Sequence, residues 1–156
     1  MPPLKRHKAL VQYSKEHYFG LMLGWKIRQG IAKKVAGKRM ARYIIEAFDA
    51  EILPHFVNEE SQLFVLLPSN DSLRLRAEQE HLSIRQKLEA LGNAPATEKL
   101  ITFATELELH IRFEERELFP HIEQQQSFEV WANAMQTHES SPHADFDRAW
   151  DDQFWK

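Results

Sequence analysis

Apolar residues recur at intervals of three and four positions along nearly the whole chain, and no stretch shows a sustained alternation of apolar and polar residues. Intervals of three and four match the turn of an α-helix, whereas alternation is typical of a half-buried β-strand. The few glycines and prolines, 5 and 7 residues respectively, gather where this pattern is interrupted. The chain is therefore predicted to be all-α.

The interruptions divide the chain into four long helices and a tail. The expected helices span about 5–30, 38–66, 71–91 and 96–125. Because the connections are short, consecutive helices should be antiparallel, which gives an up-down-up-down four-helix bundle. We expect residues 1–156 to form a single domain, with the bundle over about 5–125 and a short helical C-terminal tail over about 126–156. Three tryptophans should pack this tail onto the bundle: Trp131, Trp150 and Trp155.

The composition argues against several classes of function. A net charge of −3 and a pI near 6.2 disfavour a nucleic-acid partner or an anionic membrane surface. The absence of cysteine excludes disulfides, thiolate zinc sites and iron–sulfur clusters. Neither a signal peptide nor an apolar run of roughly 18 residues is found, so we expect a soluble, cytoplasmic protein. One basic cluster is expected to be a solvated surface: Lys33, Lys34, Lys38, Arg39 and Arg42.

Two segments of the chain, 51–64 and 106–119, repeat one another. In each, a histidine has glutamate four positions before it, glutamates four and five positions after it, and Leu-Phe at positions eight and nine. A Glu-His pair precedes each segment within another predicted helix. The order His, then His-x-x-x-Glu, thus occurs twice: His17, His55, Glu59, His81, His110 and Glu114.

The four-residue spacing has a physical meaning, because it advances an α-helix by just over one turn and places His and Glu on one face. Both pairs lie on apolar stripes, so they should point into the bundle. An ionised carboxylate in a dry core is costly unless something compensates for it. Since the motifs carry no Lys or Arg at their inward positions, two buried carboxylates among four imidazoles predict a bound metal cation.

The donor types narrow the choice of metal. Imidazole nitrogens with carboxylate oxygens suit iron, zinc, copper or nickel, whereas magnesium and calcium prefer mainly oxygen. Two carboxylates on facing helices can each bridge two metals, which leaves two histidines for each metal. We predict two iron ions in a non-haem di-iron centre, with manganese or zinc as alternatives.

At these residues the sequence resembles the hemerythrin-like, HHE cation-binding family, whose members carry the same doubled order in a four-helix bundle. The likeness extends over about residues 5–125. It implies that the six residues are metal ligands and that Glu59 and Glu114 bridge the two metals. Family members bind dioxygen reversibly, sense oxygen, iron or redox state, or handle nitric oxide and peroxide stress. The resemblance therefore implies a small diatomic molecule or peroxide as the partner.

One departure from the family pattern affects this expectation. The oxygen-carrying hemerythrins have a fifth histidine on the third helix, four residues from its neighbour. Here the positions one turn from His81 are Ala77 and Arg85. Both metals should therefore keep an open or water-filled position, which speaks against reversible oxygen carriage.

Three activities fit the predicted site. The first, which the sequence favours, is a di-iron protein that binds or senses dioxygen, nitric oxide or peroxide. The second is a di-iron enzyme, such as a peroxidase or a nitric oxide-handling stress protein. The third is iron storage or buffering, which is disfavoured because ferritin-type sites use four Glu and two His in Glu-x-x-His pairs. The sequence is compatible with an enzyme or with a binding protein that has no catalytic activity, and with a monomer or an oligomer.

Several residues near the motifs have more than one interpretation. Glu51 and Glu106, one turn before a predicted ligand histidine, could accept a hydrogen bond from the imidazole or form ordinary salt bridges. Glu60 and Glu115 should be solvated or paired with arginine. The histidines outside the pattern are not expected to bind metal: His7, His121, His138 and His143.

Overall fold

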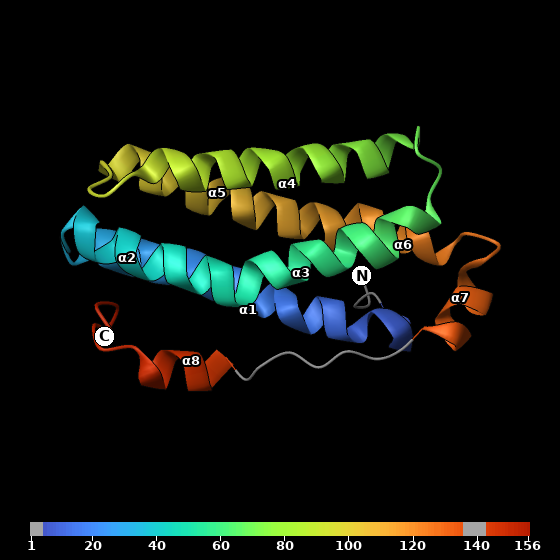
Figure 1. The fold of residues 1–156 in the computed structure, drawn as a ribbon, viewed down its shortest axis with the longest axis horizontal. Coiled ribbons are helices and arrows are strands. Elements are labelled where there is room, and N and C mark those ends of the chain that lie inside the picture. The colour runs from blue at the N-terminus through green and yellow to red at the C-terminus, as the bar shows by residue number, and fades with distance from the viewer. Residues whose placement is uncertain (1–4, 136–142) are drawn as a thin grey trace.

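The computed structural model describes residues 5–135 and 143–156 of the chain. Within these ranges every regular element is a helix, as the sequence predicted. Figure 1 shows long helical rods that lie lengthwise beside one another, and the colour order shows that each runs opposite to the rod before it. The chain therefore folds as an all-α bundle of antiparallel rods.

Each rod corresponds to one predicted helix. The first contains the 3-10 turn η1 (Lys8–Leu10) and α1 (Val11–Ala32). The second is a continuous run of α2 (Gly37–Ala47), η2 (Phe48–Ile52), α3 (Leu53–Asn58), η3 (Glu59–Leu63) and η4 (Phe64–Leu66). The third is α4 (Ser72–Leu91), and the fourth joins α5 (Thr97–Phe113), η5 (Glu114–Leu118) and α6 (Phe119–Glu123). The largest boundary error is at the start of the first rod, expected at residue 5 and observed at Lys8.

Local signals explain where the third rod begins and ends. The Asp71 carboxylate accepts hydrogen bonds from the backbone N–H groups of Leu73 and Arg74, each at 3.0 Å, and so caps α4. At the other end Gly92 adopts a φ of +62°, a left-handed conformation that glycine reaches without strain. Asp71 and Gly92 thus set the two ends of α4 close to the predicted range of 71–91.

Three short segments, η2, η3 and η5, are π-helical rather than α-helical. Two of them begin at predicted metal ligands, Glu59 and Glu114. The remaining segment, η2, lies just before Pro54, which lacks the backbone N–H that a regular α-helix would use as a hydrogen-bond donor. Figure 1 shows the second rod changing direction where α2 meets α3. Because π-helical turns occur frequently at functional sites, they draw attention to this part of the bundle.

The interior contains two apolar clusters with a charged layer between them. Along the first rod, Leu10 and Tyr13 belong to one cluster and Leu23 and Ile27 to the other, and His17 lies between the two pairs. The same order is found along the fourth rod. The buried polar side chains of the described residues gather mainly in this middle layer.

The C-terminal tail packs against the bundle, as predicted. It contains α7 (Phe128–Ala134) and α8 (His143–Ala149). Trp155 is buried in one apolar cluster with Trp150 packed beside it, and Trp131 packs on the other. The basic cluster is exposed, as expected, and two of its members, Arg39 and Arg42, also form ion pairs with acidic residues of this tail. Across the described residues, no helix has both the length and the apolar character needed to cross a membrane.

Candidate metal centre

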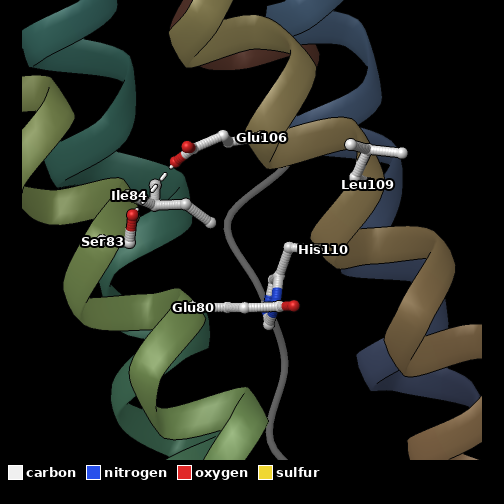
Figure 2. A pocket seen from close by; sticks show the side chains of 6 residues that line it. All are labelled: Glu80, Ser83, Ile84, Glu106, Leu109 and His110. Atoms are coloured by element: carbon white, nitrogen blue, oxygen red, sulfur yellow. Dashed lines mark hydrogen bonds and ion pairs between the residues drawn. The ribbon is translucent and has the colours of Figure 1, made fainter.

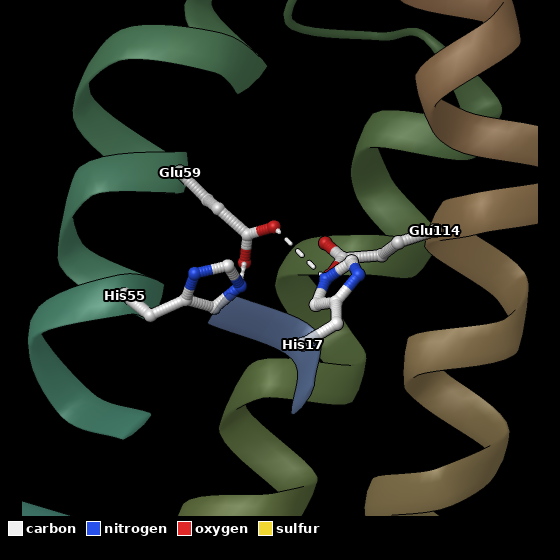
Figure 3. Close-up of side chains that lie close together, drawn as sticks. All are labelled: His17, His55, Glu59 and Glu114. Carbon is white, nitrogen blue, oxygen red and sulfur yellow. Dashed lines mark hydrogen bonds and ion pairs between the residues drawn. The ribbon is translucent and has the colours of Figure 1, made fainter. Parts of the chain in front are cut away.

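The six residues of the doubled motif meet in the middle layer of the bundle. They come from all four rods, and none is more than 4% exposed. Figure 3 shows four of them, His17, His55, Glu59 and Glu114, with their polar ends turned toward one another. Residues separated by almost a hundred positions in the sequence thus form a single cluster of donor atoms.

Each carboxylate in this layer lies between two imidazole Nε2 atoms from different rods. Glu59 Oε1 is 3.2 Å from His55 Nε2 and 3.3 Å from His81 Nε2. The other carboxylate has equivalent contacts, since Glu114 Oε1 is 3.2 Å from His110 Nε2 and 3.0 Å from His17 Nε2. The site therefore has the approximate two-fold arrangement that the sequence repeat suggests.

Most of these facing atoms do not form hydrogen bonds. Within the described part of the chain, six atoms of the layer are buried without a hydrogen-bond partner: Nε2 of His55, His81 and His110, both carboxylate oxygens of Glu59, and Oε2 of Glu114. Buried polar atoms in proteins are almost always partnered. Imidazole nitrogens and carboxylate oxygens are ligands for transition metals, so the unpartnered atoms fit a bound metal.

The donor atoms fall into two overlapping groups, within each of which the atoms lie at most 4.8 Å apart. One group contains His17 and His55, and the other contains His81 and His110. Both groups include the same two carboxylates, Glu59 and Glu114. The geometry can therefore accommodate one cation in each group, with the carboxylates shared between them.

The opposite nitrogen of every imidazole, Nδ1, is held by a glutamate outside the ligand set. The distances from Nδ1 to the carboxylate oxygen range from 2.7 to 3.0 Å. The pairs are His17–Glu115, His55–Glu16, His81–Glu60 and His110–Glu80. A carboxylate beside Nδ1 accepts a hydrogen bond from the Nδ1–H group. This bond orients the ring and leaves Nε2 free to bind a metal.

This pairing decides between the two interpretations of Glu51 and Glu106, neither of which holds a site imidazole. Glu106 does not hold a site imidazole but forms a salt bridge with Lys87, at 3.1 Å. Glu51 lines a small cavity beside Tyr43 instead. The sequence did contain a signal for the true partners, because each is adjacent to a predicted ligand, in the pairs Glu16-His17, Glu59-Glu60, Glu80-His81 and Glu114-Glu115.

Glu60 and Glu115 were expected to be solvated or paired with arginine, which is only part of their role. Glu60 contacts Arg85 at 3.4 Å and Glu115 contacts Arg6 at 2.9 Å. Each also accepts a hydrogen bond from a site imidazole, so these two carboxylates link the middle layer to Arg85 and Arg6. Burial would raise the pKa of Glu115, but the hydrogen bond and the charge of His17, with a smaller contribution from Arg6, lower it to about 2.

The charges in the layer stabilise one another. Burial alone lowers the pKa of His55 and His110, but the carboxylates Glu59 and Glu114 outweigh it, and both pKa values rise to about 9. Burial would raise the pKa of Glu59, yet the imidazoles hold it well below its usual range. The metal-free layer thus keeps Glu59 ionised beside protonated imidazoles, and a cation can replace those protons.

The two positions where a fifth histidine could have stood are occupied in other ways. Ala77 is fully buried in an apolar cluster. The guanidinium of Arg85 contacts Glu60 rather than the motif residues of the middle layer. Neither position supplies an additional nitrogen donor to the site.

The two described histidine side chains outside the pattern, His7 and His121, do not join the site. His7 Nε2 is 3.2 Å from Glu129 on α7, and His121 Nε2 is 2.7 Å from the Asp71 carboxylate that caps α4. His138 lies outside the described residues, as does the side chain of His143. The prediction that His7 and His121 are not part of the cluster is confirmed.

A pocket of about 190 Å³ leads from the surface toward the layer between α4 and α5. Its lining is shown in Figure 2, where Glu80 and His110 lie beside each other and Ser83 contacts Glu106. The pocket therefore brings solvent to the hydrogen bond between Glu80 and His110, at one side of the candidate site.

Comparison with known families supports this interpretation. Residues 25–122 match the hemerythrin HHE cation binding domain. The matched segment contains five of the six motif residues, whereas His17 precedes it, so the match is shorter than the expected 5–125. No match was found among curated proteins or among solved structures. Since the matched segment covers more than half of the sequence, the chain belongs to the hemerythrin HHE cation-binding domain family.

Proposed function

We propose that this protein is a non-haem di-iron protein that binds or senses a small ligand, namely dioxygen, nitric oxide or peroxide. The observation that carries the proposal is the set of buried, unpartnered nitrogen and oxygen atoms facing one another in the middle layer. We assign His17 and His55 to one iron, His81 and His110 to the other, and Glu59 and Glu114 to both as bridges.

The donor set supports iron over the lighter divalent cations. Four imidazoles and two carboxylates give a mixed nitrogen and oxygen environment, in which magnesium or calcium would lack enough oxygen ligands. When bound, iron would supply a redox-active Lewis acid with room for an exogenous ligand. Manganese or zinc would fit the same donors, so metal analysis decides between them.

The protein's own contribution is to fix the donors in position. Four glutamates hold the Nδ1 atoms, and aromatic rings fix the planes of two imidazoles. Phe56 stacks on His81 with ring centroids 3.7 Å apart, and Phe119 stacks on His17 at 5.3 Å. The apolar clusters on both sides exclude water from the layer. Such preorganisation keeps the ligand atoms in place before a metal arrives.

The absence of a nitrogen donor from Ala77 and Arg85 supports ligand binding with reaction rather than reversible oxygen carriage. With two histidines and two shared carboxylates for each metal, coordination positions would remain for exogenous ligands. A second candidate is a di-iron enzyme acting on peroxide or nitric oxide. The pocket that reaches Glu80 and His110 favours it, because solvent there can deliver protons to the edge of the site.

We also propose a cytoplasmic location. The sequence contains no cysteine, so the fold needs no oxidising compartment to form disulfides.

Anaerobic reduction followed by titration tests the proposal. The purified protein should contain iron, and absorption spectroscopy should follow its reaction with dioxygen, nitric oxide and hydrogen peroxide in turn. A stable adduct supports a binding or sensing role, whereas repeated turnover supports the enzyme. A protein that holds a redox-inert metal after expression in iron-rich medium would overturn both.

A further inference from the structure

The middle layer is built from two equivalent halves of the chain. The first and third rods each supply a Glu-His pair, and the second and fourth rods each supply a His-x-x-x-Glu-Glu motif. In this register His17 corresponds to His81, and His55 corresponds to His110. Each position beside the site therefore has a counterpart in the other half, and a difference between counterparts shows where the symmetry is broken.

The half that contains Glu80 and His110 is open to solvent. The pocket between α4 and α5 is lined by this pair, and its volume of about 190 Å³ holds several water molecules at about 30 Å³ each. Glu80 is 28% exposed. Ser83 and Glu106 also line the pocket, and the small Ser83 side chain donates a hydrogen bond to Glu106 at 3.2 Å (Figure 2). A hydrated cation thus has room directly beside a site imidazole.

The half that contains Glu16 and His55 is closed. Glu16 is only 6% exposed, and the cavity that it borders with His55 has a volume of about 10 Å³ and a fully buried lining. The counterpart of Ser83 is Phe19, since each follows the histidine of its rod by two positions. Phe19 packs against an apolar cluster, and together with Glu51 it lines a cavity that has no room for a water molecule. An aromatic ring thus fills the place where the other half has its pocket.

The arginines that contact the outer carboxylates follow the same division. Arg76 and Arg85, which contact Glu80 and Glu60 in the open half, are 48% and 36% exposed. Arg6, which covers the outer carboxylate beside His17, is 12% exposed. Exposed ion pairs are weak because water and salt screen them. The outer carboxylates of the open half are therefore held less firmly than those of the closed half.

We propose that metal is exchanged through one half of the site only. The pocket between α4 and α5 is the route by which a divalent cation enters and leaves the position of His81 and His110. The cation at His17 and His55 stays in place until the bundle opens locally. This inference rests on the two metal positions of the proposed function, but it concerns the exchange of the metal and not its reaction with a small ligand.

Substitutions that swap the counterparts test the route. Ser83→Phe gives the open half the residue of the closed half, and Leu109→Trp fills the same pocket from α5 if Ser83→Phe fails to fold. Phe19→Ser opens the closed half, with Phe19→Ala as the variant that places no hydroxyl there. Leu82→Phe is the matched control, because Leu82 is 49% exposed on α4 and does not line the pocket. Ser83→Ala removes the hydrogen bond to Glu106 without filling the pocket.

The measurement is the release of iron to a chelator. Anaerobic, Fe(II)-loaded protein is mixed with an excess of a coloured Fe(II) chelator, and absorption follows the release after the iron content of every variant has been determined. The wild type should release one iron in a fast phase and one in a slow phase. Ser83→Phe and Leu109→Trp should slow the fast phase at least about tenfold, since about 1.4 kcal/mol of extra barrier has that effect. Phe19→Ser should accelerate the slow phase by a similar factor.

Leu82→Phe and Ser83→Ala should match the wild type in both phases. Release of both irons in a single phase would overturn the one-sided route while leaving the di-iron function intact. Equal slowing of the two phases in Ser83→Phe, or unchanged rates in all the pocket variants, would also overturn it. A wild type that takes up no iron would instead count against the proposed function, so the two failures are distinguishable.

Discussion

The bundle buries charge in two regions, the histidine and glutamate layer and the surroundings of Lys26. Lys26 is 1% exposed, yet its ammonium donates a hydrogen bond to Tyr43 Oη at 2.8 Å and forms an ion pair with Asp147. The ammonium also lies 4.5 Å from the centre of the Trp155 ring. In the middle layer, by contrast, most of the inward polar atoms have no hydrogen-bond partner within the described chain.

This difference separates a structural charge from a ligand site. The partners of Lys26 include residues of the C-terminal tail, so the buried cation helps to fasten the tail to α1 and α2. Burial lowers the pKa of Lys26, and the hydrogen bond to Asp147 opposes that shift. No further ion is needed there. In the middle layer the imidazole and carboxylate atoms point at a common space, and a cation shared among them would complete their interactions.

The largest expected effect comes from the middle layer. Chelating the metal should lower the free energy of unfolding by about 4 kcal/mol, the mass-action value when free metal exceeds its dissociation constant a thousandfold. His55→Ala and His110→Ala should lose metal in stoichiometric amounts and melt near the temperature of the chelated wild type. Metal analysis and thermal unfolding measure both effects.

His121→Ala serves as the control for these variants, because His121 contacts the Asp71 carboxylate that caps α4 and lies outside the site. It should retain full metal content. Full retention in His55→Ala and His110→Ala as well would show that the layer is not the metal site.

The Lys26 region should respond in stability but not in metal content. Asp147→Ala removes the carboxylate partner of a buried ammonium, and because Asp147 is itself 18% exposed, we expect a loss of about 3 kcal/mol, the low end for breaking a buried pair. Lys26→Met removes the buried charge itself and leaves Asp147, which is 18% exposed, able to turn to water. We therefore expect a smaller loss from Lys26→Met. Denaturant unfolding gives both values, and a reversed order would contradict the assignment.

The helices and the six motif residues could be predicted because their signals are local. Asp71 caps α4 through its own neighbours, and Gly92 ends it through its own backbone angle. His55 and Glu59 share a helix face whatever the rest of the bundle does. The fold and the donor set therefore followed from spacing along single helices.

The partners of the imidazole Nδ1 atoms depend on the rotation of neighbouring rods, which spacing does not encode. Glu51 shares a helix face with His55, but the Nδ1 of His55 is turned toward Glu16 on α1. Glu60 would lie about 100° around a regular helix from Glu59. In the π-helical turn η3 it faces α4 and reaches His81. Contacts between rods, rather than spacing along one helix, therefore determine which glutamate holds each imidazole Nδ1.

A pair of matched variants sharpens this correction. Glu16→Gln keeps the size of the side chain but removes the charge that orients His55, and loss of such a partner typically weakens metal binding about 10- to 100-fold. Glu106→Gln, at the position first considered for this role on the fourth rod, should leave the affinity unchanged. Competition with a chelator of known affinity measures both. Equal weakening in the two variants would mean that the negative charge near the site, rather than the hydrogen bond to His55, strengthens metal binding.

The two regions should also differ in their response to pH. The folded-state pKa of His55 and of His110 is about 9, above the unfolded value of 6.5. Their contribution to the stability of the metal-free protein is therefore fully present below pH 6.5 and is lost as the pH rises to about 9. Metal binding needs neutral imidazoles and improves over the same interval. The gap in melting temperature between loaded and metal-free protein should widen from pH 6.5 to 9.

Lys26→Met provides the comparison for this experiment, because it alters the other buried charge and leaves the imidazoles in place. Its loaded and metal-free forms should show the same widening gap. A gap that is constant with pH would mean that protons and metal do not compete for the layer.

The smallest effect is expected where the tail meets the basic cluster at the surface. Arg39 forms an ion pair with Asp152 at 2.7 Å, and Arg42 forms one with Asp151 at 2.9 Å. Both arginines are about half exposed, so water and salt screen their interactions. Arg39→Ala and Arg42→Ala should each change the melting temperature only slightly, and the change should fade as salt is added. The tail should stay in place, because Trp155 and the Lys26 interactions remain, and tryptophan fluorescence reports this directly. A large, salt-independent loss in either variant would mean that surface charge, rather than the buried ammonium, fastens the tail.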